Sequence, residues 1–284
     1  MPNDRFEVLV PDLFFPEGLR WHEDELWFSD VFGNAVFRVV NGVARKVADV
    51  PGMPSGLGWL PDGSAIAVSC QQRALLRVTP SGETEMHADL GEYLQYDAND
   101  MVVDPLGRAY VGNYGYDVEG GDTPQPTHLL RVDLAGKVTV EAPEVTFPNG
   151  AVLTNQGRTL IVAETSMDRL VTMSVAEDGS LSAATVFAEM PKGFGPDGID
   201  VDADGGVWVA GAWGEAVRRY SSSGSLTHRL DLPGVGVYCC VLGGQDGRTL
   251  FVATASTDEE YAARVRTGQI LTCRVDVPAV GAAA

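Results

Sequence analysis

Short runs of alternating apolar and small residues recur along the chain, and each begins after a polar or glycine turn. Six runs share this phrase, and their central residues are Trp27, Ile66, Tyr110, Ile161, Trp208 and Phe251. The centres are about 39 to 51 residues apart, the period of a four-stranded propeller blade rather than of a helical solenoid. No long stretch has helical periodicity. The sequence therefore predicts an all-β fold: a six-bladed β-propeller with four-stranded antiparallel blades around a central channel.

The repeat runs the length of the chain, so we expect a single propeller domain over residues 1–284. A pair of β-sandwiches would also contain short strands, but nothing in a sandwich requires one phrase six times. Residues 6–10 lie too early for the first blade. We expect them to supply the outer strand of the last blade, beside residues 270–275, which removes a free edge. Residues 279–284 have the composition of a frayed tail.

Composition narrows the class of partner. The chain has 33 Gly and 16 Pro among 284 residues, which fits many short strands joined by turns. Its formal net charge of −19 disfavours nucleic acid and anionic membranes as partners. The sequence has no bilayer-length apolar run and no signal-peptide pattern, so we expect a cytoplasmic protein, a monomer or small homo-oligomer. Its four cysteines have the spacing of reduced, buried thiols.

A second shared phrase precedes each apolar run and marks the start of the innermost strand of a blade. One position in this phrase is expected to face the central axis from every blade, and it is occupied by Glu17, Ser55, Asn99, Asn149, Asp197 and Val237. Four of these six side chains present carboxylate or amide oxygen, the donors that a hard cation such as Ca²⁺ prefers. The alternative is a hydrated channel whose polar residues contact water. The four histidines are scattered outside this position, which disfavours a three-histidine zinc site.

Four of these phrases carry a family resemblance. They begin at Pro16-Glu17-Gly18, Asn99-Asp100, Phe147-Pro148-Asn149-Gly150 and Gly195-Pro196-Asp197-Gly198-Ile199, and they resemble the SMP-30/gluconolactonase/LRE family of six-bladed propellers. The resemblance implies one divalent metal held by Glu17, Asn149 and Asp197, with Ca²⁺ favoured and Zn²⁺, Mn²⁺, Mg²⁺ or Fe²⁺ as alternatives. It implies that Asn99 contacts the substrate or a metal-bound water.

The same resemblance implies hydrolysis of a lactone, a cyclic ester. The metal would polarise the carbonyl oxygen and activate a water, and Asp197 would act as the general base. The chain departs from the family's sugar-acid lactonases at Asp97, where those enzymes often carry an arginine. Aromatic residues near the expected rim, Tyr96, Tyr114 and Trp213 together with Tyr116, favour a flatter or more apolar substrate. The alternative is that these rings pack between blades.

Two other functions stay open at this level. A related propeller enzyme would act on organophosphates or another non-sugar substrate with the same metal set. A non-catalytic binding propeller is the other alternative, and it gives no reason for acid and amide oxygens at one shared position. The stretch 200–205 copies the opening of an EF-hand loop but lacks the glutamate at the twelfth position, so we expect a hairpin turn there. The acidic run 258–260 is expected to be a solvated loop.

Overall fold

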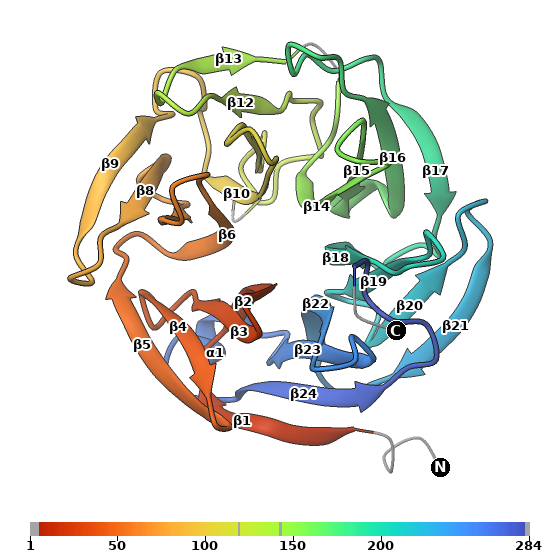
Figure 1. Ribbon diagram of the computed structural model, residues 1–284. Coiled ribbons are helices and arrows are strands. Elements are labelled where there is room, and N and C mark those ends of the chain that lie inside the picture. Colours follow the sequence, from red (N-terminus) through yellow and green to blue (C-terminus); the bar gives the residue numbers. More distant parts are fainter. Residues whose placement is uncertain (1–5, 119, 142–143, 282–284) are drawn as a thin grey trace.

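The computed structural model describes residues 6–118, 120–141 and 144–281. Its strands form six antiparallel sheets of four strands each, arranged in a ring around a central axis (Figure 1). The six-bladed β-propeller predicted from the repeat is therefore confirmed. Helical structure in the described ranges is confined to short segments such as the 3-10 turn η2 (Thr165–Met167) and the four-residue helix α1 (Glu259–Ala262).

Each blade runs from an inner strand beside the axis to an outer strand at the perimeter. Blade 1 comprises β2 (Pro16–His22), β3 (Glu25–Asp30), β4 (Ala35–Val40) and β5 (Val43–Asp49). Blade 2 comprises β6 (Pro54–Trp59), β7 (Ala65–Ser69), β8 (Ala74–Val78) and β9 (Thr84–Asp89). Blade 3 comprises β10 (Ala98–Val103), β11 (Ala109–Asn113), β12 (Leu130–Val132) and β13 (Val138–Val140).

The second half of the ring follows the same order. Blade 4 comprises β14 (Pro148–Thr154), β15 (Thr159–Glu164), β16 (Arg169–Ser174) and β17 (Thr185–Glu189). Blade 5 comprises β18 (Pro196–Val201), β19 (Val207–Gly211), β20 (Ala216–Tyr220) and β21 (Leu226–Asp231). Blade 6 comprises β22 (Gly236–Gly243), β23 (Thr249–Ala255), β24 (Gly268–Arg274) and β1 (Glu7–Leu13).

The last blade is built from both ends of the chain. Strand β1 is antiparallel to β24, and Glu7 lies opposite Thr272 (Figure 1). Near the other terminus, the Ala279 amide donates to the Gly247 carbonyl at 2.8 Å. Residues 1–5 and 282–284, the last of which end the expected tail, lie outside the described residues. Among the described helices, none has the length and hydropathy needed to cross a membrane.

The hydrophobic core lies between neighbouring blades, because each sheet buries both faces against the sheets beside it. One cluster joins Ile66 and Leu75 of blade 2 to Met101 and Val111 of blade 3, and all four side chains are fully buried. The central strands β7, β11 and β19 are buried at every position, as the apolar runs in the sequence predict. This packing leaves the starts of the inner strands around the axis.

Hydrogen bonds within the hairpin turn explain the polar and glycine residues that precede each apolar run. Between β18 and β19, Asp202 Oδ1 accepts hydrogen bonds from the backbone amides of Asp204 at 3.1 Å and Gly206 at 2.9 Å. Asp202 also accepts from the Arg219 guanidinium. The carboxylate is therefore occupied by amides of the hairpin and by Arg219 of β20, which agrees with the prediction that this EF-hand-like stretch is a turn.

Candidate functional site

The inner strands share one irregularity near their starts. Strand pairing shifts between Pro148 and Ala151 in β14 and between Pro196 and Ile199 in β18, and equivalent shifts occur in the other four blades. Such a shift leaves the residues inside it outside the regular ladder and redirects their side chains. Asn149 lies in one of these intervals and Asp197 in another. The repeat therefore places Asn149 and Asp197 where regular strand pairing is interrupted, whereas Glu17 is paired with Ser29 at the edge of the shift in β2.

The glycine after each of several site residues allows the inner strands to approach one another. A Cβ atom on Gly150 would lie 2.3 Å from the Asp197 carbonyl oxygen, and one on Gly198 would lie 2.5 Å from Cys239 Sγ. A Cβ on Gly18 would lie 2.2 Å from the Ser55 carbonyl oxygen. Any side chain at these positions would force the blades apart. The polar-glycine phrase thus encodes both a side chain for the site and the close contact that positions it.

Two carboxyl groups of the cavity lie on different blades, Glu17 on β2 and Asp197 on β18. Ser55 Oγ donates to Glu17 Oε2 at 2.7 Å. Burial, together with the charge of Asp100, raises the pKa of Glu17 to about 8. The pKa of Asp197 is raised well above its usual value. Burial is the largest cause, and the charge of Glu17 is the next. Both carboxyl groups are therefore held where their negative charges are not compensated, a condition that a cation relieves.

The amide side chains are oriented by the bonds of their nitrogens. Asn149 Nδ2 donates to Thr165 Oγ1 at 3.2 Å, and Thr165 Oγ1 donates in turn to the Pro196 carbonyl at 2.8 Å. Asn99 Nδ2 makes a longer contact of 3.5 Å to the Pro148 carbonyl. Because the nitrogens are engaged by the wall, the amide oxygens are the atoms left for a ligand.

The floor beneath the carboxyl groups holds a buried ion pair that the sequence analysis did not anticipate. The Arg20 guanidinium donates to Asp100 Oδ1 and to the Met101 carbonyl, each at 2.7 Å, and to the Leu57 carbonyl at 3.1 Å. Asp200 accepts from the Leu242 amide at 2.7 Å, and burial raises its pKa to about 6. The guanidinium charge of Arg20 is therefore committed to the floor rather than to the cavity above.

Aromatic rings form much of the cavity wall. The full lining consists of Phe15, Glu17, Val31, Phe32, Met53, Ser55, Cys70, Asn99, Tyr114, Phe147, Asn149, Thr165, Asp197, Ala212, Trp213, Tyr238 and Glu259. The Tyr114 and Phe147 rings are 4.7 Å apart, and burial raises the pKa of the Tyr114 phenol well above its usual value. Trp213 is exposed at the rim. A polar floor with aromatic walls suits a small organic molecule that has one polar group to be held.

Most of the predicted site residues meet in this cavity. Its lining includes Glu17, Asn99, Asn149, Asp197, Tyr114 and Trp213. It does not include Tyr96 or Asp97. The Asp97 carbonyl accepts the Tyr114 amide at 3.0 Å, and the Tyr96 hydroxyl accepts from Gln95 Nε2 at 3.2 Å. These two residues precede β10 and its pairing shift, and, after burial, the charge of Asp97 still contributes to raising the pKa values of Cys70 and Tyr114 in the lining. Their predicted contact with substrate stays a prediction.

Tyr116 and Glu259 lie in positions that differ from those expected from the sequence. Tyr116 is buried with its ring edge toward Phe147, 6.0 Å between centroids, so it packs under the wall rather than at the rim. Glu259, expected in a solvated loop, lies in α1 and lines the cavity. The local sequence around Glu259 contains no signal for this position, because the connection from β23 to β24 brings it back over the axis.

The donor set fits a divalent cation in its chemistry. It offers two carboxyl groups with raised pKa values and two amide oxygens, all of them hard ligands. Among the described residues, no group of three or more His, Cys, Asp or Glu side chains is arranged to hold a metal ion. Any cation bound here therefore needs the amide oxygens of Asn149 or Asn99 beside Glu17 and Asp197. The free cysteines Cys70, Cys239, Cys240 and Cys273 are buried, as predicted.

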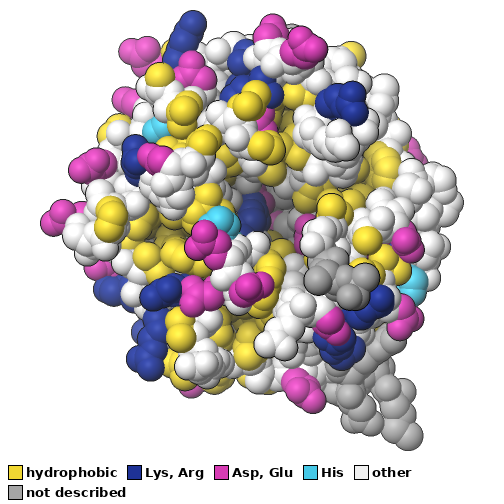
Figure 2. Space-filling view, in the orientation of Figure 1, with side chains coloured by type: hydrophobic (Ala, Val, Ile, Leu, Met, Phe, Trp, Pro, Cys, Tyr) yellow, Lys and Arg dark blue, Asp and Glu magenta, His cyan; other side chains and the backbone are white. Residues whose placement is uncertain are grey.

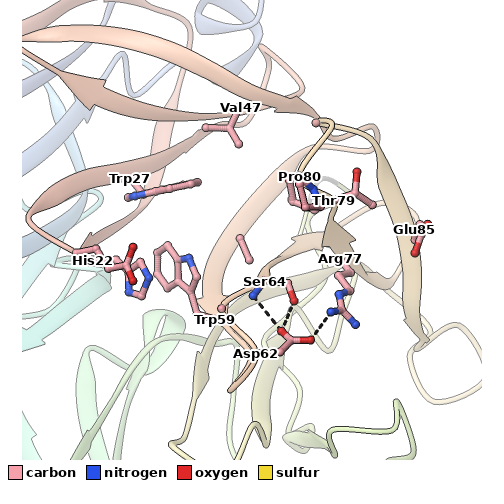
Figure 3. Close-up of a pocket in the computed structure, with 15 residues that line it drawn as sticks. His22, Trp27, Val47, Trp59, Asp62, Ser64, Arg77, Thr79, Pro80 and Glu85 are labelled. Carbon is pink, nitrogen blue, oxygen red and sulfur yellow. Dashed lines mark hydrogen bonds and ion pairs between the residues drawn. The ribbon is translucent and has the colours of Figure 1, made fainter.

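A larger hollow lies away from the axis, in the groove between blades 1 and 2 (Figure 3). The His22 and Trp59 rings stack there at 3.8 Å, and Asp62 pairs with Arg77 and Ser64. Figure 2 shows charged side chains of both signs spread around the perimeter of one face, with hydrophobic side chains between them. In the groove Asp62 is paired with Arg77, whereas in the axial cavity the pKa values of the carboxyl groups of Glu17 and Asp197 are raised. The axial cavity is therefore the candidate active site.

A propeller with acid and amide oxygens converging at one end of its axis defines a class of small-molecule-binding β-propellers. Residues 15–256 match the profile of the SMP-30/Gluconolactonase/LRE-like region. The chain belongs to this family, as the sequence phrases indicated.

The chain is similar over most of its length to proteins that are named as lactonases. It is 30% identical over 252 residues to the pentonolactonase XacC of Haloferax volcanii, covering 87% of this chain and 84% of the relative. It is also 30% identical over 209 residues to a 6-deoxy-6-sulfogluconolactonase of Pseudomonas putida, covering 68% of this chain and 70% of the relative. Both relatives are named as lactonases.

Solved structures share the fold. A luciferin-regenerating enzyme superposes with a TM-score of 0.81 at 19% identity, covering 98% of this chain and 97% of that one. Regucalcin from Agrobacterium tumefaciens, described as a calcium-binding protein, superposes with a TM-score of 0.77 at 22% identity, covering 96% of this chain and 94% of that one. At these identities the likeness concerns the architecture.

Proposed function

We propose that the protein is a metal-dependent hydrolase that opens the ring of a small lactone. Glu17, Asn149 and Asp197 would hold one divalent cation, with Ca²⁺ favoured because all the donors are oxygen. The observation that carries this proposal is the convergence of two carboxyl groups with raised pKa values and oriented amide oxygens in one cavity. The names of the two lactonase relatives support the substrate class.

The chain's own residues have separate tasks in this reaction. Asp197 accepts the proton of the water that attacks the lactone carbonyl carbon. Asn99 contacts the substrate from the neighbouring wall, and the rings of Tyr114 and Trp213 cover the apolar face of the lactone. A divalent cation, when bound, supplies Lewis-acid polarisation of the carbonyl and lowers the pKa of water. Glu259 of α1 lines the cavity and the Arg20–Asp100 pair does not, so we expect the substrate to enter from the side of α1.

A second candidate is a non-sugar substrate such as an organophosphate ester, which the aromatic wall favours. Phe15, Phe32, Phe147 and Tyr238 offer few hydrogen bonds to a polyhydroxylated ring. The same donors would serve both reactions, so only activity separates them. The small-molecule substrate, the soluble cytoplasmic setting and a monomeric or small homo-oligomeric state belong to the same proposal.

The test combines metal content with turnover. Purified protein is analysed for bound metal, then assayed against a panel of neutral lactones and phosphotriesters before and after chelation. We expect lactone hydrolysis that chelation removes and Ca²⁺ restores. Asp197→Asn and Asn149→Leu should each lower kcat/KM by at least about a hundredfold. Asp204→Asn is the matched control, because this carboxylate is exposed at the hairpin turn of the same blade.

Three results would count against the proposal. Lactone turnover that persists after complete metal removal would exclude metal dependence. Asp197→Asn activity within tenfold of the Asp204→Asn control would remove Asp197 from the catalytic role. Turnover of phosphotriesters without any lactone would favour the second candidate.

A further inference from the structure

Four side chains in the described lining of the axial cavity carry a hydroxyl group. Three of these hydroxyls donate to acceptors of the protein itself: Ser55 to Glu17, Thr165 to the Pro196 carbonyl, and Tyr238 to the Ser256 carbonyl at 3.0 Å. The fourth belongs to Tyr114, and the described residues provide no hydrogen-bond partner for it. The described lining also contains no Lys, Arg or His. The Tyr114 hydroxyl is therefore the hydroxyl donor of this lining that is left for a ligand.

Blade 3 fixes the backbone of Tyr114. The residue follows β11, and its amide donates to the Asp97 carbonyl at 3.0 Å, which continues the pairing of β11 beyond its last residue. The chain then turns at Gly115, where φ is +77° and a Cβ atom would lie 2.7 Å from Thr127 Cβ. Tyr114 thus occupies a defined position at the end of a strand.

The side chain of Tyr114 is held at the ring and reaches the cavity with its hydroxyl. The ring packs against Phe147, with 4.7 Å between centroids and 53° between planes. Burial is the largest cause of the raised pKa of the phenol, followed by the charges of Cys70 and Glu17. Because charge effects weaken with distance, the phenol oxygen lies on the side of the cavity that Cys70 and Glu17 line.

Opening a lactone leaves one oxygen that needs a proton. The attacking water forms a bond to the carbonyl carbon and gives its proton to Asp197. The bond between that carbon and the ring oxygen then breaks, and its electron pair stays on the ring oxygen. An alkoxide is a strong base, so a nearby donor that protonates this oxygen lowers the barrier. A phenol meets the requirement, because its ordinary pKa of about 10 keeps it protonated at neutral pH.

We propose that Tyr114 is a catalytic residue of this site, whose hydroxyl gives its proton to the ring oxygen as the lactone opens. The inference rests on the proposed function, because it assigns one step of the same hydrolysis. The proton that Asp197 took from water returns to the Tyr114 oxygen through water in the cavity, so both groups regain their starting state. One lactone and one water are consumed, and one hydroxy acid is formed.

The test varies the leaving oxygen. Tyr114→Phe removes the hydroxyl and keeps the ring against Phe147. It is assayed on two six-membered lactones, δ-valerolactone, which releases an alkoxide, and dihydrocoumarin, which releases a phenolate. A phenolate leaves with little help, since the pKa of a phenol is only about 10. We expect kcat to fall at least about a hundredfold with δ-valerolactone and less than about fivefold with dihydrocoumarin.

Tyr116→Phe is the matched control. It removes a hydroxyl from the same connection between β11 and β12, but this hydroxyl is bonded to Ser166 and the residue does not line the cavity. Its kcat should stay within about threefold of wild type with both lactones. The Ca²⁺ affinity of Tyr114→Phe, measured by calorimetry, should equal that of the wild type, because the phenol is not among the proposed ligands.

Several results would overturn the inference while leaving lactone hydrolysis in place. Equal losses of kcat with the two lactones would give Tyr114 a positioning role without proton transfer. An unchanged kcat with δ-valerolactone would remove the hydroxyl from the reaction. A loss of Ca²⁺ affinity as large as the loss of kcat would assign the hydroxyl to the metal site instead. A wild type that opens lactones of neither kind would overturn the proposed function, and this inference with it.

Discussion

Arg20 of blade 1 and Asp100 of blade 3 form an ion pair across the floor of the axial cavity, with 2.7 Å between Nη2 and Oδ1. The same guanidinium binds the Leu57 carbonyl of blade 2. One side chain therefore joins the inner strands of three blades. Because the Asp100 side chain is only 5% exposed and that of Arg20 19%, loss of Arg20 leaves a buried carboxylate without its cation.

Replacing Arg20 should make the propeller less stable to unfolding. Arg20→Met leaves Asp100 buried without its cation, so we expect the free energy of unfolding to fall by about 3–5 kcal/mol. Urea denaturation followed by tryptophan fluorescence measures this. Arg38→Met, which breaks an exposed pair with Glu25, should cost at most about 1 kcal/mol. Equal losses in the two variants would contradict a structural role for the floor pair.

The glycine at 150 is required by its neighbour rather than by its own conformation. In Gly150→Ala, the new Cβ would lie 2.3 Å from the Asp197 carbonyl oxygen and 2.7 Å from Gly198 Cα. Both are backbone atoms, so the inner strands must separate, and we expect a loss of at least about 2 kcal/mol in stability. Thermal unfolding measures it. Gly91→Ala, whose Cβ meets only the flexible Asp89 side chain at 3.1 Å, is the control and should change stability by less than about 1 kcal/mol.

Thr165 acts on the proposed metal site through Asn149. Thr165→Val removes the hydroxyl that accepts a hydrogen bond from Asn149 Nδ2. The amide is then free to turn its oxygen away from the cavity. We expect Ca²⁺ affinity, measured by calorimetry, to fall about tenfold. Thr165→Ser keeps the hydroxyl and should restore most of the affinity. Unchanged Ca²⁺ binding in Thr165→Val would show that the orientation of Asn149 does not depend on this bond.

The raised pKa of Glu17 predicts how the stability of the metal-free protein depends on pH. The pKa of Glu17 is about 8 in the folded protein against 4.5 ordinarily, so the folded state holds this proton more tightly than the unfolded chain. The free energy of unfolding should therefore fall as the pH rises from about 6.5 to about 8. His22 and His87, whose pKa values burial lowers, act oppositely but only at lower pH. Saturating Ca²⁺ should remove most of the fall, because it stabilises the charged carboxylates.

Calorimetric melting curves at several pH values, with chelator or with Ca²⁺, measure this effect. Glu17→Gln cannot ionise at this position, so its metal-free stability should depend less on pH across the same interval. A wild-type protein that becomes more stable between about pH 6.5 and about pH 8 without metal would contradict the raised pKa of Glu17.

The repeated pattern was enough to predict the ring, because each blade encodes the same turn and apolar run. It also predicted the convergence of Glu17, Asn99, Asn149 and Asp197, since equivalent positions of symmetric repeats must face one axis. Arg20 escaped prediction for a specific reason. The pairing shift between Glu17 and Arg20 changes the alternation along β2, so counting by twos from Glu17 does not find it.

Other parts of the site depend on contacts that no local pattern contains. Asp97 and Tyr96 are close to Asn99 in sequence, but they lie before the shift in β10 and outside the cavity lining. Glu259 is far from every site phrase and reaches the cavity through the path of the β23–β24 connection. Its neighbours in sequence have the composition of a solvated loop, and only the folded ring distinguishes it from them.

Among the described strands, β1 is synthesised first and its partner β24 last. On the ribosome, residues 7–13 must wait without a hydrogen-bonded neighbour until residues 268–274 emerge. Closure of the ring therefore requires that residues 268–274 have been synthesised, and a chain released before that point would expose an unpaired edge able to join another copy.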